Sequence, residues 1–252
     1  MITKHYHFDV LDSTNRKAKE LAEQGCDDGT LVTAEAQEAG VGRRGRSWSS
    51  QKGTGIYMSM ILRPQLEIQT VSMLTLVAAM AVAKAFEQLQ IFSESTPCIK
   101  WPNDIVLNRK KICGILTELY LKENEIDCVI VGVGINVSNQ SFPEEIQKTA
   151  SSILLETGKQ VDRELLIKTI WNIFSNYYRK FLVTEDFSLL KEEYEAYLLN
   201  KGRGVKVLDP AGEYEGLAMG ITNKGELLVD TDGKERIVSS GEVSVRGIYG
   251  YV

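Results

Sequence analysis

Histidine and cysteine, the usual protein ligands of transition metals, are scarce in this 252-residue chain. The two histidines, His5 and His7, stand close together, and the four cysteines are widely spaced with no CxxC pair. Zinc and iron–sulfur centres are therefore disfavoured. A chain of this size needs no cross-links for its core, so we expect free thiols, mostly buried. The cysteines are Cys26, Cys98, Cys113 and Cys128.

Long hydrophobic runs are also missing. The one candidate, residues 71–86, is short for a membrane span and contains Lys84, which predicts a buried core helix instead. The N-terminal residues lack the apolar region of a signal peptide, so the cytoplasm is the expected location. With 29 basic and 34 acidic residues, the net charge of -5 excludes a generally basic nucleic-acid binder but leaves room for a local basic patch.

Several common catalytic signatures are absent as well. There is no GxSxG sequence, and no cysteine–histidine pair suggests itself, which disfavours hydrolases with a covalent nucleophile. The glycine-rich segment at residues 40–48 lacks the GK[ST] ending of a Walker A loop. No helical pattern follows it, so it is not a dinucleotide-binding fingerprint either.

The hydrophobic patterning predicts an α+β fold with a central mixed or antiparallel sheet flanked by helices. Predicted strands cover residues 5–11, 30–34, 56–62, 98–101, 105–107, 112–121 and 126–137, the last four as an antiparallel meander. Predicted helices follow Asp12, span residues 71–89, begin at Asp162, and span residues 189–198. From residue 201 short strands and turns indicate a small β-barrel, so we divide the chain into residues 1–200 and 201–252.

The most unusual segment is GVGRRGRSW, from Gly40 to Trp48, with three arginines and three glycines in an acidic protein. Arginine binds phosphate or carboxylate through a planar fork of donors, and glycine lets a backbone approach an anion. Trp48 is suited to stack on a base or to pack as a lid. An exposed basic turn or an RNA-binding patch remains the alternative.

Three further segments have a structural explanation that is favoured when each is considered alone. In KWPND, at residues 100–104, an aspartate at a bend can hold Mg²⁺, but a charged hairpin turn explains it too. The glycines of GVGIN, at residues 132–136, indicate close approach of a ligand or simply a strand end. Residues 12–15 are a helix N-cap or a polar binding site. Together these anion binders and a stacking aromatic indicate phosphoryl or nucleotidyl transfer.

Taken in order, the motifs resemble those of the biotin protein ligases. The resemblance rests on STN at Ser13–Asn15, Gln37, GxGRRGRxW at Gly40–Trp48, KWPND at Lys100–Asp104, KICGIL at Lys111–Leu116, GVGIN at Gly132–Asn136 and GEVSVRG at Gly241–Gly247. Each motif is weak, but the ordered set is specific and spans nearly the whole chain. The resemblance implies a class II synthetase-like catalytic domain with a small SH3-like barrel.

The family reaction has two steps. The biotin carboxylate attacks the α-phosphate of ATP, with Mg²⁺, to give biotinyl-5′-AMP and pyrophosphate. A lysine on the biotin carboxyl carrier domain of acetyl-CoA carboxylase, or of a related carboxylase, then takes the biotinyl group as an amide. The resemblance further implies no DNA or membrane partner and a possible homodimer. Because both reacting groups are anionic, cations must bring them together.

The resemblance also implies a role for individual residues on the biotin side. Biotin's ureido ring is expected to be held by Ser13, Thr14, Asn15 and Gln37. The backbone of Gly114 and Ile115 is expected to line the pocket. Val41, Gly42 and Arg43 are expected to close over biotin, and Gly40 is assigned to the same biotin site. Lys111 is expected to contact the biotin carboxylate and to stabilise charge at the acyl phosphate.

On the nucleotide side, Arg43 and Arg46 are expected to contact phosphates. Trp48 is expected over the biotin tail or the adenosine. The adenine is assigned to Asn103 and Asn136, and Asp104 is placed near the metal. Arg246 is expected to reach over from the small barrel.

Two departures from the family pattern bear on function. Some members have arginine where this chain has Val41, so biotin affinity is expected to differ. The chain also begins almost at the first catalytic strand, so we expect no winged-helix repressor domain and no operator binding. With three glycines and few apolar anchors, the loop at residues 40–48 is expected to be mobile until ligand orders it.

Two alternatives remain open. A lipoate ligase of the same fold would use a longer, purely apolar acyl pocket, which the polar residues at 13–15 and Gln37 argue against. An RNA-binding module would use Arg43–Arg46, which the net charge and the lack of a second arginine cluster argue against.

Overall fold

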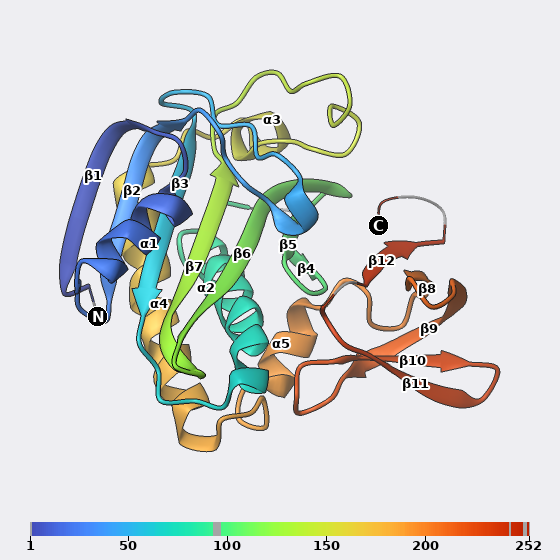
Figure 1. Ribbon diagram of the computed structural model, residues 1–252. Coiled ribbons are helices and arrows are strands. Elements are labelled where there is room, and N and C mark those ends of the chain that lie inside the picture. The colour runs from blue at the N-terminus through green and yellow to red at the C-terminus, as the bar shows by residue number, and fades with distance from the viewer. Residues whose placement is uncertain (1, 93–96, 242, 249–250, 252) are drawn as a thin grey trace.

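The computed structural model describes residues 2–92, 97–241, 243–248 and 251, and it contains two sheets (Figure 1). The first has seven strands in the order β1-β2-β3-β7-β6-β5-β4. Its strands are β1 (Lys4–Leu11), β2 (Thr30–Gln37), β3 (Gly55–Leu62), β4 (Cys98–Lys100), β5 (Asp104–Leu107), β6 (Lys110–Lys122) and β7 (Glu125–Asn136). β1 and β2 are parallel and the other pairs are antiparallel, so the sheet is mixed, as predicted.

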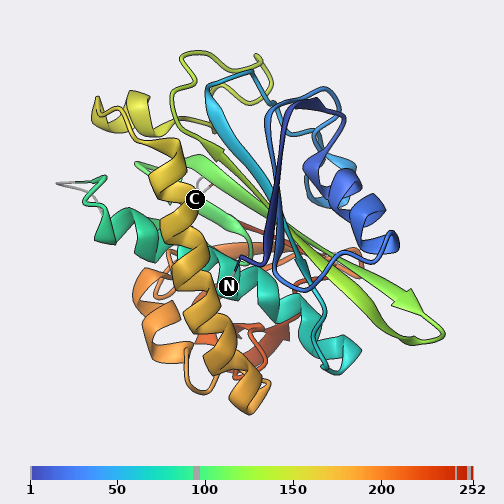
Figure 2. The ribbon, with the colours of Figure 1, turned by 90° about the vertical axis from the view of Figure 1, so that its left-hand side faces the viewer.

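Helices cover both faces of this sheet. The α-helices are α1 (Thr14–Glu23), α2 (Leu74–Gln88), α3 (Ile153–Thr157), α4 (Arg163–Thr184) and α5 (Lys191–Tyr197), and the 3-10 helices are η1 (Arg43–Gly45) and η2 (Ile68–Met73). Figure 2 shows α1 on one face of the sheet and α2 with α4 on the other. α4 begins where the sequence predicts, because the Asp162 side chain accepts a hydrogen bond from the Leu165 backbone N–H.

The apolar stretch in the middle of the chain is a core helix. One helical segment, Ile68–Gln88, passes a length and composition test for a membrane span, but 67% of its most apolar window is buried inside the protein. It packs against α4 and against β4, β5, β6 and β7, and its buried alanine, valine and leucine side chains belong to the main core. The prediction of a buried helix over residues 71–86 is therefore confirmed. Cys113 and Cys128 are buried, and Cys26 and Cys98 are half-buried.

The C-terminal part forms a five-stranded antiparallel sheet in the order β11-β10-β9-β8-β12. Its strands are β8 (Gly204–Leu208), β9 (Tyr214–Ile221), β10 (Leu227–Thr231), β11 (Lys234–Val238) and β12 (Ser244–Gly247). Within the described residues β11 and β12 remain the two edges and do not pair, so the predicted barrel is not closed. The connection between them turns toward the first unit, where two of its carbonyls accept hydrogen bonds from Arg43.

The two parts share one hydrophobic core. Buried side chains of β8, β9 and β10 belong to the same cluster as those of α2, α4 and α5. Trp101, at the end of β4, donates its indole N–H to the Gly225 carbonyl 3.0 Å away, and its backbone N–H donates to Asn200 Oδ1. The division at residues 200 and 201 stays a prediction, and the packing joins the two parts closely.

Candidate active site

A cleft of about 430 Å³ opens between the start of α1, the end of β2, the loop after it, and the middle of β6 and β7. Its lining includes most of the residues that the motifs single out: Ser13, Thr14, Asn15, Gln37, Val41, Gly42, Arg43, Trp48, Asn103, Lys111, Gly114 and Ile115. The sequence therefore predicted most of the lining.

One end of the cleft is polar, because the first residues of α1 point into it. Ser13 occupies the N-cap position, but its side chain makes no capping hydrogen bond. A capping role therefore does not explain residues 12–15. Thr14 donates its backbone N–H to Gln37 Oε1 at 2.8 Å, and its hydroxyl oxygen lies 3.1 Å from the same oxygen. Gln37 in turn donates from Nε2 to the Ser50 hydroxyl, which holds the amide in one orientation.

Two residues that the sequence analysis did not select complete this polar end. Ser59 of β3 is fully buried, and its hydroxyl lies 2.8 Å from Thr14 Oγ1 and 2.6 Å from Asn15 Oδ1. Glu118 of β6 accepts a hydrogen bond from Asn15 Nδ2 at 2.6 Å. The sequence signal was a lone serine in the apolar strand YMSMIL; nothing comparable marked Glu118.

The glycines of β6 and β7 make room for two cleft side chains. A Cβ on Gly132 would collide with the amide of Asn15, and one on Gly134 would lie 2.5 Å from the Trp48 ring. A Cβ on Gly114 would lie 2.8 Å from the same ring. Trp48 thus lies flat against bare backbone, and its indole N–H is buried without a partner among the described residues. Close approach is what glycines in a strand predict.

The other end of the cleft carries buried charges. Lys111 Nζ lies 2.6 Å from Asp104 Oδ1 and 5.4 Å from the centre of the Trp48 ring. The backbone of Lys111 is fixed by hydrogen bonds with Thr149 and Ser151. Burial by itself would raise the pKa of the Asp104 carboxyl, but Lys111, Tyr251 and Lys100 together outweigh it and the pKa is lowered. Asp104 is therefore ionised, and Lys111 is held beside it.

Tyr251, near the C-terminus, reaches the same carboxylate. Its hydroxyl donates to Asp104 Oδ2 at 2.6 Å, and burial, together with that carboxylate, raises the pKa of the phenol. The Lys100 ammonium lies 3.5 Å from the centre of the Tyr251 ring. Burial lowers the pKa of Lys100 to about 8. The sequence analysis missed Tyr251 because 147 residues separate it from Asp104.

The arginine loop is attached to the C-terminal sheet. Arg43 donates to Asn103 Oδ1 at 3.0 Å and to the carbonyls of Ser240 and Gly241, and Arg44 donates to the Ser244 hydroxyl. Burial lowers the pKa of the Arg43 guanidinium. In GEVSVRG, Glu242 lies outside the described residues.

Five predicted site residues do not line the cleft: Gly40, Arg46, Asp104, Asn136 and Arg246. Gly40 accepts the Trp48 backbone N–H, and a Cβ there would meet the Trp48 carbonyl at 2.6 Å, so it shapes the loop. Asp104 acts on the cleft through Lys111. Arg46 and Arg246 lie close enough to Lys100 and Tyr251 to influence their charge.

The two asparagines assigned to adenine are engaged elsewhere. Asn136 donates to the Ser151 carbonyl and is buried at the end of β7, so its amide donor closes a strand end instead. Asn103 lines the cleft, but it bridges Arg43 and the Ile115 carbonyl.

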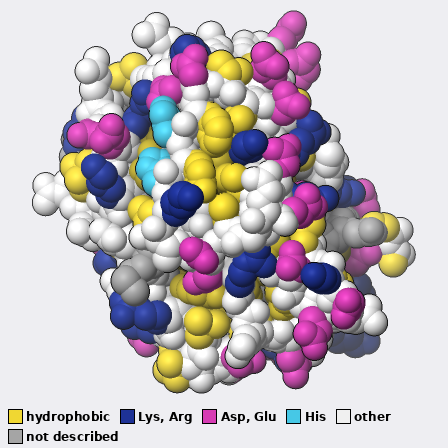
Figure 3. All heavy atoms as spheres, turned by 60° about the vertical axis from the view of Figure 1, so that its left-hand side comes forward, with side chains coloured by type: hydrophobic (Ala, Val, Ile, Leu, Met, Phe, Trp, Pro, Cys, Tyr) yellow, Lys and Arg dark blue, Asp and Glu magenta, His cyan; other side chains and the backbone are white. Residues whose placement is uncertain are grey.

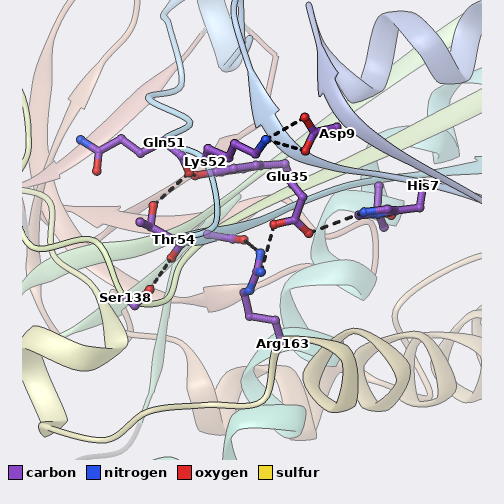
Figure 4. Close-up of polar contacts among 11 residues, drawn as sticks. His7, Asp9, Glu35, Gln51, Lys52, Thr54, Ser138 and Arg163 are labelled. Atoms are coloured by element: carbon purple, nitrogen blue, oxygen red, sulfur yellow. Dashed lines mark hydrogen bonds and ion pairs between the residues drawn. The ribbon is translucent and has the colours of Figure 1, made fainter.

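A second polar network holds the far end of the loop (Figure 4). Arg163, at the start of α4, donates to Glu35 Oε2 at 3.0 Å and to the Gly55 carbonyl, as Figure 4 shows. Lys52 pairs with Asp9 of β1 at 2.7 Å. The Thr54 carbonyl accepts hydrogen bonds from the backbone N–H groups of Val137 and Ser138, just after β7. The loop is thus fixed at its end, and Arg43, Arg44 and the packed Trp48 hold its middle.

Known proteins share this architecture. Residues 7–136 match the model of the biotin/lipoate A/B protein ligase family, and residues 202–246 match that of the biotin protein ligase C-terminal domain. The bifunctional ligase/repressor BirA of Bacillus subtilis is 41% identical over 238 residues, 93% of this chain and 72% of that protein. The biotin–[acetyl-CoA-carboxylase] ligase of Paracoccus denitrificans is 30% identical, covering 94% of this chain and 98% of its own.

A solved structure agrees with these matches. The biotin protein ligase of Aquifex aeolicus in complex with biotin and ATP superposes with a TM-score of 0.83 at 33% identity, over 97% of this chain and 99% of that one. The predicted fold class is confirmed by this similarity. The chain belongs to the biotin/lipoate A/B protein ligase family and carries the C-terminal domain of the biotin protein ligases.

Proposed function

We propose that this chain is an ATP-dependent biotin–protein ligase, which activates biotin as biotinyl-5′-AMP and transfers it to a lysine of a carrier domain. One observation carries the proposal: a single cleft has a hydrogen-bonding end at Thr14 and Gln37 and a cationic end at Lys111. Biotin has the matching shape, with a polar ureido ring at one end and a carboxylate at the other. Trp48 packs along the apolar stretch between them.

Lys111 is the residue that we assign to charge stabilisation. Its ammonium is positioned by Asp104 and by a rigid strand, so it need not reorganise as negative charge develops on the acyl phosphate. Arg46, Lys100 and Arg246 add positive charge on the side where a triphosphate would lie. The reaction then depends on holding two anions together.

Asp104 fits a Mg²⁺ site in which the protein supplies one carboxylate and the substrate phosphates supply further ligands. The described residues contain no group of three or more histidine, cysteine or acidic side chains that would form a complete metal cage. When bound, Mg²⁺ would neutralise phosphate charge, and Asp104 would hold it. Asp104 Oδ1 contacts Lys111 and Oδ2 contacts Tyr251, so one of these contacts must give way to the metal.

The acceptor that we propose is a lysine on a small carboxyl carrier domain of acetyl-CoA carboxylase or a related enzyme, in the cytoplasm. β5 pairs with residues 110–114 of β6, and among the described residues no strand pairs with residues 116–122 of β6 on that side. Because β6 also carries Lys111, a carrier that adds a strand there would lie near the cleft. The same edge would suit a second copy of this chain.

The two alternatives fit less well. Lipoate has no ureido group for the polar end of the cleft. RNA binding would need a continuous basic surface, yet Figure 3 shows Lys/Arg and Asp/Glu side chains interspersed over the visible face. RNA binding that survives Arg46→Ala, in a protein without adenylation activity, would favour that alternative.

The transfer step provides the test. The protein is incubated with biotin, ATP, Mg²⁺ and a carrier domain, and biotin on the carrier is detected with streptavidin. We expect labelling that requires ATP and disappears when the acceptor lysine is changed to arginine. Labelling that is independent of ATP, or none with several carriers, would contradict the proposal.

A further inference from the structure

A chain of hydrogen bonds runs from Glu118, below the cleft, to Gln37 on its wall. Glu118 accepts from Asn15 Nδ2 at 2.6 Å, and Asn15 Oδ1 lies 2.6 Å from the Ser59 hydroxyl. Ser59 is 2.8 Å from Thr14 Oγ1, which is 3.1 Å from Gln37 Oε1. Thr14, Asn15 and Gln37 line the cleft, whereas Ser59 and Glu118 do not.

The carboxylate gives this chain a direction. An ionised carboxylate only accepts hydrogen bonds, so Asn15 must turn its NH₂ group to Glu118 and its carbonyl to Ser59. That carbonyl also only accepts, so the single proton of the Ser59 hydroxyl is committed to Asn15. Ser59 therefore presents a lone pair to Thr14.

The chain of hydrogen bonds then has one proton too few for its contacts. The Thr14 hydroxyl has acceptors on both sides, Ser59 Oγ at 2.8 Å and Gln37 Oε1 at 3.1 Å, and it can donate to one of them only. Gln37 cannot reverse its amide, because Oε1 accepts from the Thr14 backbone N–H and Nε2 donates to Ser50. When Thr14 donates to Ser59, Thr14 Oγ1 and Gln37 Oε1 remain at the cleft as two acceptors with no proton between them. A ligand that brings an N–H donor supplies the missing hydrogen bond.

We propose that Glu118 and Ser59 are positioning residues that set ligand specificity. They orient the chain of hydrogen bonds so that the cleft binds a ligand with an N–H donor. The inference rests on the proposed function. The biotin ureido group supplies two N–H donors, and lipoate supplies none. Discrimination between the two acids thus originates at a carboxylate that does not line the cleft.

Glu118→Gln tests the proposal. A glutamine can donate, so Asn15 can reverse, Ser59 can donate to Thr14, and Thr14 can donate to Gln37. The chain then satisfies itself without a ligand N–H. We expect biotin binding to weaken about tenfold, the scale of one hydrogen bond. KM for biotin should rise while kcat stays unchanged, because the reacting atoms are at the other end of the cleft.

The decisive readout is the coupling between protein and ligand. Calorimetry compares biotin with biotin methylated at either ureido nitrogen, for wild type and for Glu118→Gln. Wild type should lose far more affinity than the variant on methylation of at least one nitrogen. Ser59→Ala should reduce this penalty in the same way, because Thr14 is then free to donate to Gln37.

Glu125→Gln, an exposed carboxylate on β7 with the same chemical change, is the matched control and should behave as wild type. Equal methylation penalties in wild type, Glu118→Gln and Ser59→Ala would overturn the inference while leaving the proposed function intact. Wild type that binds no biotin would overturn both.

Discussion

Lys111 is the residue on which the chemistry of the cleft depends most. Its ammonium lines the cleft, pairs with a carboxylate that lies deeper in the protein, and is fixed through its own backbone. An exposed lysine on a flexible stem has none of these restraints. Preorganisation of this kind distinguishes a group that stabilises developing charge from one that merely attracts an anion.

Lys111→Ala should lower biotin-dependent pyrophosphate release by about 100- to 1000-fold, the range found when one charge-stabilising donor is removed. The fold should persist, as circular dichroism would show. Because the variant leaves Asp104 without its cation, Lys111→Met/Asp104→Asn controls for the lost ion pair. Unchanged pyrophosphate release in Lys111→Ala would refute the role.

The lowered pKa of Lys100 predicts that the stability of the protein depends on pH. Its pKa falls from 10.5 to about 8 on folding, so between these values the unfolded chain binds more protons than the folded one. The free energy of unfolding of wild type should therefore rise with pH relative to that of Lys100→Met. Urea unfolding of both proteins at about pH 7.5, 8.5 and 9.5 measures the difference. A difference that stays constant, or that changes in the opposite direction, would contradict the burial of this charge.

At the level of residues, sequence patterns identified cleft side chains that belong to a local motif. Thr14, Gln37, Trp48 and Lys111 all line one cleft. Ser59, Glu118 and Tyr251 were missed, because their contacts join positions 45, 103 and 147 residues apart. A side chain whose function depends on such a partner has no local signal.

Among the elements, β6 and β7 matter most, because their glycines leave bare backbone on which the cleft side chains rest. Periodicity predicted both strands, as well as α2 and α4, because each buries a continuous apolar face. It did not predict the parallel pairing of β1 with β2, nor the open edges of the C-terminal sheet. Pairing direction and closure depend on tertiary contacts, which alternation of apolar residues does not encode.

Gly134→Ala should displace Trp48 from the cleft. The new Cβ would lie 2.5 Å from the indole ring, which must move because the strand backbone is fixed by β3 and β6. We expect a shift in tryptophan emission and at least tenfold weaker biotin binding. Gly241→Ala, where a Cβ meets nothing within 4 Å, is the control. Emission and affinity equal to those of wild type would mean that the ring does not rest on this strand.

For the whole molecule, Arg43 and Arg44 link the loop to the C-terminal part, Arg43 across 197 residues of sequence. The sequence analysis predicted a mobile loop from its glycines and its lack of apolar anchors. The structure adds polar anchors, which the sequence could not indicate because they are backbone carbonyls of Ser240 and Gly241. Loop order therefore depends on how the two parts pack.

Limited proteolysis measures this dependence. Arg43→Ala should be cut faster than wild type within residues 40–48, because three hydrogen bonds are lost. Biotin with ATP should slow cutting of wild type, since ligand orders the loop and excludes water from the adenylate. Cutting at the same rate with and without ligands would show that the loop does not close.

Pyrophosphate release tests the central claim most directly. Wild-type protein is supplied with ATP and Mg²⁺, and release is followed with biotin, with lipoate, and with neither acid. The account predicts release with biotin alone, because the polar end of the cleft requires an N–H donor and the cationic end requires a carboxylate. Release with lipoate but not with biotin, or with neither acid, would contradict it.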